Sequence, residues 1–367
     1  MPITPWEVSE KIDYNRLIEQ FGLQRFKSLP SQFKDNVLFR REIIFAHRDF
    51  NQILDSIQKK KPFAMMTGLM PSGKFHFGHK MVADQVIFYQ NLGAKIYLNV
   101  ADVEAYNSRN PNLKELRETA IKEYLTNYLA LGLDLKKCDF YFQSSRSKDG
   151  QKSNAYYSLA NFLARHVTAN EFKAIYGEIP PGKMVSALLQ AADMLHPQLK
   201  EFSPKPIPVV VPVGADQDPH LRLARDLSKR IKEFNFIQLS STYHQFMPGL
   251  KGGKMSSSDP LSYLSLTESA EEVELKIKKH AFSGGQPTLE EHRKKGGDPE
   301  VDVPFQMLKF GLEPDDKKLK QIEIDYRSGK LLTGEIKKIL IDKLVTFLKQ
   351  HQRKRKLAEK TAEKYVV

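Results

Sequence analysis

Short apolar runs alternate with amphipathic stretches in the first half of the chain. PFAMMTG at 62–68 is an apolar run closed by a glycine, which predicts a buried strand. Residues 78–92 carry apolar side chains at helical spacing before Gly93, and KIYLNVAD at 95–102 predicts a second strand. A strand, a tight loop, a helix and a strand form a βαβ unit. We therefore expect a parallel sheet with a ligand site at the carboxyl ends of its strands.

The pattern changes further along the chain. Apolar runs at 207–214 and 234–241 predict a third and a fourth strand, whereas residues 111–200 are interpreted as mostly helical. From residue 265 onward the sequence predicts only helices, including a long one that begins near Thr333. The expected parts are an N-terminal extension (1–60), an α/β domain with a Rossmann-like parallel sheet (61–264) containing a helical insertion (about 105–195), and an all-helical domain (265–367).

The composition is that of a folded protein. Of the 367 residues 41% are hydrophobic and 28% charged, and the length suits two or three domains. A single cysteine, Cys138, excludes an internal disulfide and a multi-cysteine zinc site. No apolar stretch is long enough to span a membrane, and the first residues lack the apolar region of a secretory signal. We therefore expect a location in the reducing cytoplasm.

The net charge of +13 has two interpretations. It is either a lysine-rich surface that keeps the protein in solution, or the mark of a polyanionic partner such as a nucleic acid. Charge alone does not choose between them.

The stretch GLMPSGKFHFGHK at 68–80 begins almost as a P-loop. That motif continues with Ser or Thr, whose hydroxyl binds Mg²⁺, but Phe75 stands there instead. His76 and His79 follow at the predicted start of a helix, where free N–H groups favour anions. Two imidazoles there can donate to phosphate oxygens, and Gly78 between them leaves room for a flat adenine. A metal site would need a third ligand, which the sequence does not place.

A second candidate element is GGKMSSS at 252–258, in a loop after the fourth predicted strand. Alone it is an ordinary surface loop. Combined with HFGH on the same sheet, it places Lys254 where a flexible cation can neutralise a departing pyrophosphate.

These residues carry a resemblance to a known family. HFGH and KMSSS resemble the HIGH and KMSKS signatures of class I aminoacyl-tRNA synthetases, with Ser257 in place of the second lysine. VGADQDPHLRLARDL at 213–227 is similar to the subgroup that activates tryptophan or tyrosine. Four further stretches resemble the archaeal and eukaryotic tryptophanyl-tRNA synthetases: PWEV (5–8), HAFSGG (280–285), GGDPEVDVPFQ (296–306) and YRSGKLLTGEIKK (326–338).

The resemblance implies an enzyme that activates tryptophan with ATP and transfers it to tRNA(Trp). Mg²⁺ would arrive with ATP, and His76, His79 and Lys254 would be catalytic. It also implies a cytoplasmic homodimer formed through the helical insertion, and a C-terminal domain that reads the anticodon. The implied ATP-binding residues are Gly68, Ser72, Gly73, His76, Gly78, His79, Gly214, Asp216, Lys254, Met255, Ser256 and Ser257.

The tryptophan pocket follows from the same resemblance. ALLQAADML at 187–195 is similar to a stretch of the bacterial tryptophan enzymes whose aspartate accepts the indole N–H, so Asp193 is the expected reader. As a surface carboxylate Asp193 would have no such role, but its neighbours are apolar. Met66 stands where related enzymes carry a tyrosine, and is expected to pack on the ring. The remaining expected contacts are Glu104, Gln190 and Gln217 to the ammonium group, and Asn99 as the alternative indole reader.

Two other functions stay open at this stage. A tyrosyl-tRNA synthetase shares the fold and both signatures, although Met66 removes one partner for the tyrosine hydroxyl. A synthetase-like tRNA-binding protein without catalysis is the other, and the intact His76, His79 and Lys254 argue against it.

Overall fold

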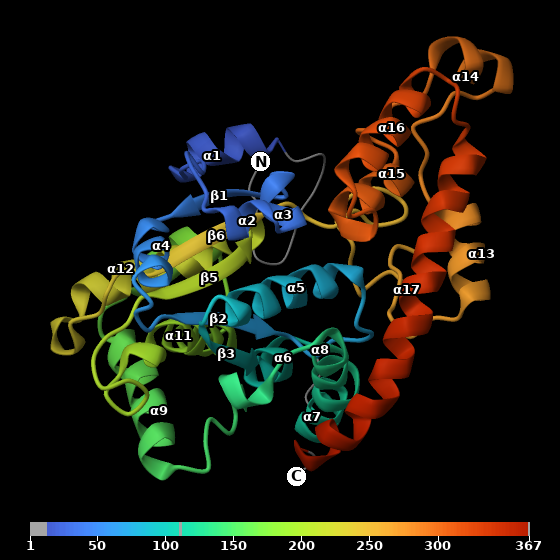
Figure 1. Cartoon of the computed structure of the whole chain (residues 1–367). Helices are drawn as coiled ribbons and strands as arrows, with labels where there is room; N and C mark the ends of the chain where they lie inside the picture. Colours follow the sequence, from blue (N-terminus) through green and yellow to red (C-terminus); the bar gives the residue numbers. More distant parts are fainter. Residues whose placement is uncertain (1–12, 110–111, 366–367) are drawn as a thin grey trace.

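One six-stranded sheet lies at the centre of the molecule (Figure 1). The structure is a computed structural model that describes residues 13–109 and 112–365. The strands are β1 (Ile44–Arg48), β2 (Ala64–Leu69), β3 (Lys95–Val100), β4 (Cys138–Phe142), β5 (Val209–Gly214) and β6 (Ser240–His244). Together with the surrounding helices they confirm the predicted α/β class.

The strand order is β1-β6-β5-β2-β3-β4, and all neighbouring pairs are parallel except β1 with β6. From β2 the chain continues outward through β3 to β4, and then returns to build β5 and β6 on the other side. The order therefore reverses between β2 and β5, which is where open parallel sheets bind ligands.

Helices cover both faces of the sheet (Figure 1). The described part of the first sixty residues contains α1 (Tyr14–Phe21), α2 (Ser31–Lys34), α3 (Val37–Arg40) and α4 (Asn51–Gln58). The sheet domain continues with α5 (Phe77–Asn91), α6 (Asp102–Ser108), α7 (Leu113–Thr119), η1 (Ala120–Leu125), α8 (Thr126–Leu131), η2 (Leu135–Lys137), α9 (Gly150–Ala164), α10 (Ala169–Tyr176), α11 (Pro181–Leu195), η3 (His196–Gln198), η4 (Ala215–Gln217), α12 (Asp218–Arg230) and η5 (Lys232–Phe234).

Successive side chains along a strand point to opposite faces of the sheet and belong to two separate hydrophobic cores. Met65 of β2 and Ile96 of β3 belong to one core, while their neighbours Met66 and Tyr97 belong to the other. This is the period of two that a sheet covered on both faces requires. The cavity described below opens where the two cores meet the carboxyl ends of the strands.

The C-terminal part is helical, as predicted. It contains α13 (Ala270–His280), α14 (Leu289–Lys295), α15 (Val303–Met307), η6 (Leu308–Leu312), α16 (Asp316–Arg327), α17 (Thr333–Ala362) and η7 (Glu363–Tyr365). Figure 1 shows α17 running down one side of the molecule from the other C-terminal helices to α8. Ile336, Leu340 and Leu344 of α17 share a continuous apolar core with Phe75 and Phe77.

The sequence interpretation was wrong about three strands. It missed β1 in the N-terminal extension and β4 inside the segment expected to be helical, both of only five residues. It also placed a strand over 234–241, whereas β6 covers Ser240–His244. Asn235 has a left-handed backbone (φ 49°), which an extended strand cannot contain. The PWEV motif at 5–8 lies outside the described residues.

The helix predicted from Leu113 to Leu131 is continuous but contains one unexpected feature. Between α7 and α8 the segment η1 is a π-helix, which widens the helix over residues 120–125. Such widened turns are rare and occur often at functional sites. Here the turn carries Glu123 and Tyr124, which both contact the loop that follows β2.

Candidate active site

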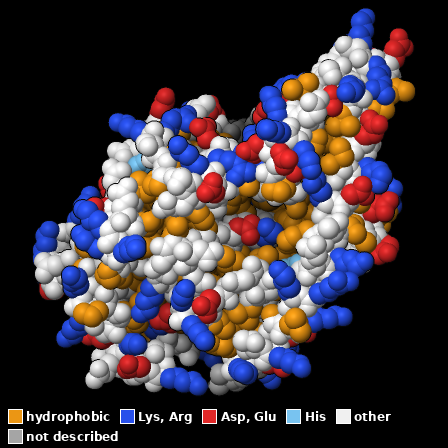
Figure 2. Space-filling model, viewed as in Figure 1, with side chains coloured by type: hydrophobic (Ala, Val, Ile, Leu, Met, Phe, Trp, Pro, Cys, Tyr) orange, Lys and Arg blue, Asp and Glu red, His pale blue; other side chains and the backbone are white. Residues whose placement is uncertain are grey.

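A cavity of about 380 Å³ opens at the carboxyl ends of β2, β3 and β5. On the face shown in Figure 2 the surface is hollowed between the sheet domain and the C-terminal helices. All predicted site residues except Gly73 line this cavity, and Gly73 lines an adjoining one. The predicted site residues that line the first cavity are Met66, Gly68, Ser72, His76, Gly78, His79, Asn99, Glu104, Gln190, Asp193, Gly214, Asp216, Gln217, Lys254, Met255, Ser256 and Ser257.

His76 and His79 form a stacked pair at the start of α5. Their ring centroids lie 3.8 Å apart. Nδ1 of His76 accepts the backbone N–H of Gly78 at 3.1 Å, and Nδ1 of His79 accepts the backbone N–H of His76 at 3.2 Å. A Cβ on Gly78 would lie 2.9 Å from Cε1 of His76, so the position requires glycine even without a ligand. The motif thus builds its own capping arrangement.

Both imidazoles are neutral at pH 7. Burial lowers the pKa of His76 to about 4, and burial lowers the pKa of His79 well below its usual value; the charge on Lys254 adds to both effects. Because each Nδ1 accepts a hydrogen bond, the hydrogen-bond pattern places the single ring proton on Nε2. Each ring therefore presents an N–H donor without carrying a charge.

The buried histidines predict acid sensitivity. Burial lowers the pKa of His76, His220 and His351 to about 4 and that of His244 to about 3, against 6.5 ordinarily. As the pH falls from about 6.5 to 4, the unfolded chain binds protons that the folded chain cannot. Stability therefore falls with falling pH in this window, by up to about 1.4 kcal/mol per histidine and pH unit. Asp193, whose pKa is raised to about 7, works in the opposite sense.

Urea unfolding at pH 7, 6 and 5 measures this effect. The free energy of unfolding should drop steeply, and the slope against pH gives the number of protons taken up on unfolding. His351→Gln should reduce that number by about one. Because a general loss of stability lowers the free energy at every pH without changing the slope, the two effects can be told apart. A free energy that stays constant from pH 7 to 5 would contradict the prediction.

Lys254 reaches the cavity from the KMSSS loop (residues 248–260). Its Nζ lies 2.5 Å from Oδ2 of Asp216 and 4.5 Å above the ring of Phe246. Phe246 fits there only because Gly214 has no side chain: a Cβ on Gly214 would lie 2.5 Å from Cε1 of that ring. The loop is held at its base, where the N–H of Met255 donates to the carbonyl of Met247 at 2.9 Å. In this structure the lysine is paired with Asp216 and has to leave it to meet a phosphate.

Asp193 lies at the floor of the cavity and is fully buried. Its Oδ1 accepts the hydroxyls of Tyr141 (2.7 Å) and Tyr156 (2.8 Å). Its Oδ2 accepts the side-chain amides of Asn99 (2.5 Å) and Gln143 (2.8 Å). A carboxylate has about four acceptor sites, so these four donors occupy them all. Burial raises the pKa of Asp193 to about 7, although the four donors favour its ionised form.

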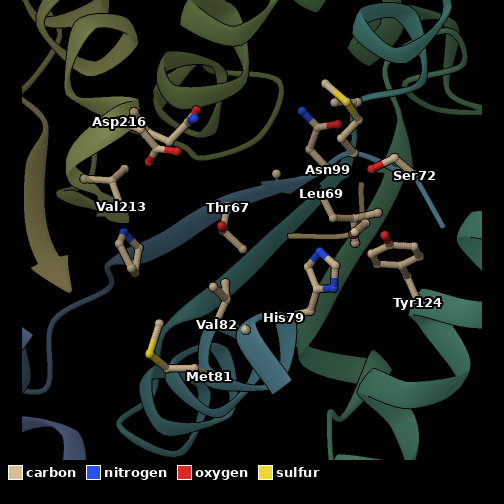
Figure 3. Close-up of a pocket in the computed structure, with 18 of the residues that line it drawn as sticks. Thr67, Leu69, Ser72, His79, Met81, Val82, Asn99, Tyr124, Val213 and Asp216 are labelled. Atoms are coloured by element: carbon tan, nitrogen blue, oxygen red, sulfur yellow. The ribbon is translucent and has the colours of Figure 1, made fainter. Parts of the chain in front are cut away.

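Asn99 is the neighbour of Asp193 that has a free acceptor. Its Nδ2 is held by Asp193, while its Oδ1 is buried and has no hydrogen-bond partner among the described residues. Asn99 comes from β3 and lines the cavity opposite Asp216 (Figure 3). An unpaired buried carbonyl is costly, and a ligand N–H would remove that cost.

Comparison with known proteins identifies the family. Residues 58–349 match the family described as tRNA synthetases class I (W and Y). The chain is 47% identical to the tryptophan–tRNA ligase of Methanocaldococcus jannaschii, over 99% of this chain and 98% of that protein. It is 44% identical to that of Aeropyrum pernix, over 99% and 97%. The chain belongs to the tryptophan–tRNA ligase family.

Solved structures agree with this membership. The tryptophanyl-tRNA synthetase of Aeropyrum pernix superposes with a TM-score of 0.89, covering 98% of both chains at 44% identity. The enzyme of Encephalitozoon cuniculi, solved bound to tryptophan, superposes with a TM-score of 0.83 at 28% identity, covering 98% of this chain and 99% of that one. This tryptophan–tRNA ligase family member thus has the class I fold with a helical C-terminal region, as expected.

The three side chains expected to bind the ammonium group of the amino acid line the same cavity as Asp193. The side-chain amide of Gln190 donates to the carboxylate of Glu104, and burial raises the pKa of Glu104. Gln217 follows β5 in η4 and lines the same cavity. Glu104, Gln190 and Gln217 therefore line one cavity together with Asn99 and Asp193, and their role toward an ammonium group stays a prediction.

Sequence reasoning missed several residues of this tryptophan–tRNA ligase site. Tyr124 of η1 lies beside His79, with ring centroids 5.1 Å apart (Figure 3). Its hydroxyl lies next to Ser72 but forms no hydrogen bond of good geometry with a described residue. Phe246, Tyr141 and Tyr156 were missed as well. No local motif marks them, because their roles come from contacts with residues far away in the sequence.

Proposed function

We propose that this chain is a tryptophan–tRNA ligase. The carboxylate of tryptophan attacks the α-phosphorus of ATP, forming tryptophanyl-adenylate as the bond to pyrophosphate breaks. A hydroxyl of the terminal ribose of tRNA(Trp) then attacks the carbonyl carbon and AMP leaves. The observation that carries the proposal is that His76, His79 and Lys254 line one cavity with Asn99, whose Oδ1 has no partner among the described residues.

The site residues divide between the two substrates. We assign ATP to the side of His76, His79, Gly78 and Lys254, where neutral imidazoles and a mobile cation can donate to phosphate oxygens. Mg²⁺ would be held by the phosphates of ATP. In the described residues no cluster of three or more His, Cys, Asp or Glu is arranged to hold a metal ion.

Tryptophan is assigned to the other side of the cavity. Met66 is buried at its wall, and Asn99 offers the free acceptor for the indole N–H. Asp193 fixes the amide of Asn99 so that Oδ1 faces the ring. Glu104 and the two glutamines would hold the ammonium group. In this assignment Asn99 accepts the indole N–H, and Asp193 orients the side chain of Asn99.

Exchange of labelled pyrophosphate into ATP tests the proposal directly. The wild-type protein should support exchange with tryptophan and not with the other amino acids. Exchange with tyrosine would favour a tyrosyl-tRNA synthetase instead. An absence of exchange with every amino acid would favour a tRNA-binding protein without catalysis.

The charge of +13 predicts a salt-dependent interaction with tRNA. Each phosphate contact made by Lys or Arg lowers log K by roughly 0.7–0.9 per unit of log salt concentration. Filter binding from 50 to 200 mM salt should therefore show tRNA affinity falling by orders of magnitude, while tryptophan affinity barely changes. A flat response for tRNA would mean that the charge serves another purpose.

We also propose a cytoplasmic homodimer. Tyr106 of α6, Phe162 of α9 and Val185 of α11 are 45%, 53% and 50% exposed, on helices that pack together in the predicted insertion. Because α11 packs against both α6 and α9, these exposed apolar side chains on neighbouring helices support an interface there. In the described part of the chain no helix has both the length and the apolar character needed to cross a bilayer. Sedimentation equilibrium would give the oligomeric state.

A further inference from the structure

The inner face of α17 meets three segments that border the ATP site. Phe347 packs on Phe77 with ring centroids 5.6 Å apart, and Nζ of Lys80 lies 5.1 Å from the centre of the Phe347 ring. Phe77 and Lys80 belong to the HFGHK motif itself. Further along α17, Gln352 and Arg355 extend toward the other two segments. Figure 1 shows the C-terminal half of α17 beside α8, and η1 also contacts α17.

Gln352 holds the segment that returns from the KMSSS loop, which we term the return segment (residues 264–268). Its Nε2 donates to the carbonyl of Glu268 at 2.8 Å and to that of Leu266 at 3.3 Å. The return segment is in turn bonded on both sides of His76. The N–H of Leu266 donates to the carbonyl of Phe75 at 3.0 Å, and the N–H of Phe77 donates to the carbonyl of Leu264 at 3.1 Å.

Arg355 reaches the ATP loop (residues 68–79) through Glu123. Its Nη2 donates to the carbonyl of Lys122 at 2.8 Å and lies 4.0 Å from Oε1 of Glu123. The same Oε1 of Glu123 lies 3.0 Å from Nζ of Lys74. The side chains of Arg355 and Glu123 are only 18% and 16% exposed, so water and salt screen their attraction little.

A third contact keeps this chain of residues in place. Nε2 of His351 lies 2.7 Å from Oδ1 of Asn127, both buried, and the amide of Asn127 donates to the carbonyl of Glu123. Glu123 therefore has its backbone tied to α17 through Asn127 and its side chain facing Arg355. The basic run at 351–356 is split as a result: His351, Gln352 and Arg355 face inward, while Arg353, Lys354 and Lys356 face solvent.

We infer that Gln352 and Arg355 are positioning residues for His76, so that the C-terminal helix takes part in tryptophan activation as well as in any binding of RNA. Gln352 acts on the backbone beside His76 through the return segment. Arg355 acts on Lys74, two residues before His76, through Glu123. Catalytic groups displaced by about 1 Å can lose on the order of 10²-fold in rate, and a loop that keeps its other bonds should lose about 10-fold. The inference rests on the proposed function.

The test is pyrophosphate exchange without tRNA, in the full-length chain. Arg355→Gln and Gln352→Ala should each lower the maximal exchange rate about 10-fold and leave the KM for tryptophan unchanged. Arg353→Gln and Gln350→Ala are matched controls, because both are exposed positions on the same helix, and they should behave as wild type. Circular dichroism and thermal unfolding would show whether each variant folds.

A double substitution distinguishes positioning from general loosening of the domain contact. If Arg355 acts through Glu123 on Lys74, then Lys74→Met combined with Arg355→Gln should slow exchange no more than the stronger single variant. If the fold-reductions in exchange rate of the two single variants multiply in the double variant, the inference is overturned. An Arg355→Gln enzyme that exchanges as fast as Arg353→Gln would also overturn it. Wild-type protein that shows no exchange with tryptophan would instead overturn the proposed function.

Discussion

Replacing the indole N–H of tryptophan by sulfur should lower the exchange efficiency of the wild-type enzyme by roughly 10⁴–10⁵-fold. A site built to hydrogen-bond one polar group rejects analogues that lack it by about this factor, because its own buried polar group is left unpaired. The unpaired group here is Oδ1 of Asn99, which has no partner among the described residues. Phenylalanine should be rejected steeply for the same reason.

Asn99→Leu tests which residue reads the ring. Leucine has a similar shape without the carbonyl, so tryptophan should lose efficiency and the sulfur analogue should not. The ratio of the two efficiencies should then collapse toward one, while the KM for ATP stays constant. An unchanged ratio in Asn99→Leu would return the role to Asp193, as the sequence resemblance implied.

Asp193→Asn supplies the complementary experiment. An amide cannot accept from all four donors, so at least one of Tyr141, Tyr156, Gln143 and Asn99 loses its partner. The orientation of the Asn99 amide is then free to change. Discrimination against the sulfur analogue should weaken, and the protein should also lose stability because buried donors are left unpaired. Asn99→Leu removes one of the four donors to Asp193, so it should also lose stability, and the two variants are compared at a temperature at which both are folded.

Lys254→Ala should slow adenylate formation by about 10²–10³-fold and leave tryptophan binding nearly unchanged. A donor that acts on charge developing in the transition state is typically worth this much. In the structure Nζ of Lys254 lies 2.5 Å from Oδ2 of Asp216, so on this proposal the lysine has to leave that carboxylate to bind a phosphate. Stopped-flow measurement of the first turnover gives the rate, and tryptophan titration gives the affinity. A first-turnover rate equal to wild type would remove Lys254 from the mechanism.

The part of the candidate site that we assign to ATP could be assembled from the sequence because its residues lie in short motifs. His76 and His79 are three positions apart, and the strand-loop-helix pattern around them places them at the end of the sheet. Lys254 follows the same logic, since its loop comes directly after the last parallel strand. A motif of a few contiguous residues fixes local geometry almost alone.

The tryptophan half could not be predicted in the same way. Three of the four donors to Asp193 lie in or near β4 and α9. They are Tyr141 in β4, Gln143 directly after β4, and Tyr156 in α9. The sequence interpretation missed β4, because five residues within a helical context carry too little periodicity to show a strand. Without those partners Asp193 was interpreted as an unpaired buried carboxylate that could accept the indole N–H. The free carbonyl of Asn99 became visible only once they were in place.

The shared apolar core has a consequence for dissecting this molecule into fragments. Ile336, Leu340 and Leu344 of α17 lie in the same cluster as Phe75 and Phe77, on either side of His76. A shortened chain ending at residue 264 would lose Phe347, which packs on the ring of Phe77, and would expose part of this core to water beside the candidate active site. Such a truncate should aggregate or bind nucleotide poorly, and heating the intact chain should give one calorimetric peak for both parts. We therefore expect the sheet domain and the C-terminal helices to unfold as one unit.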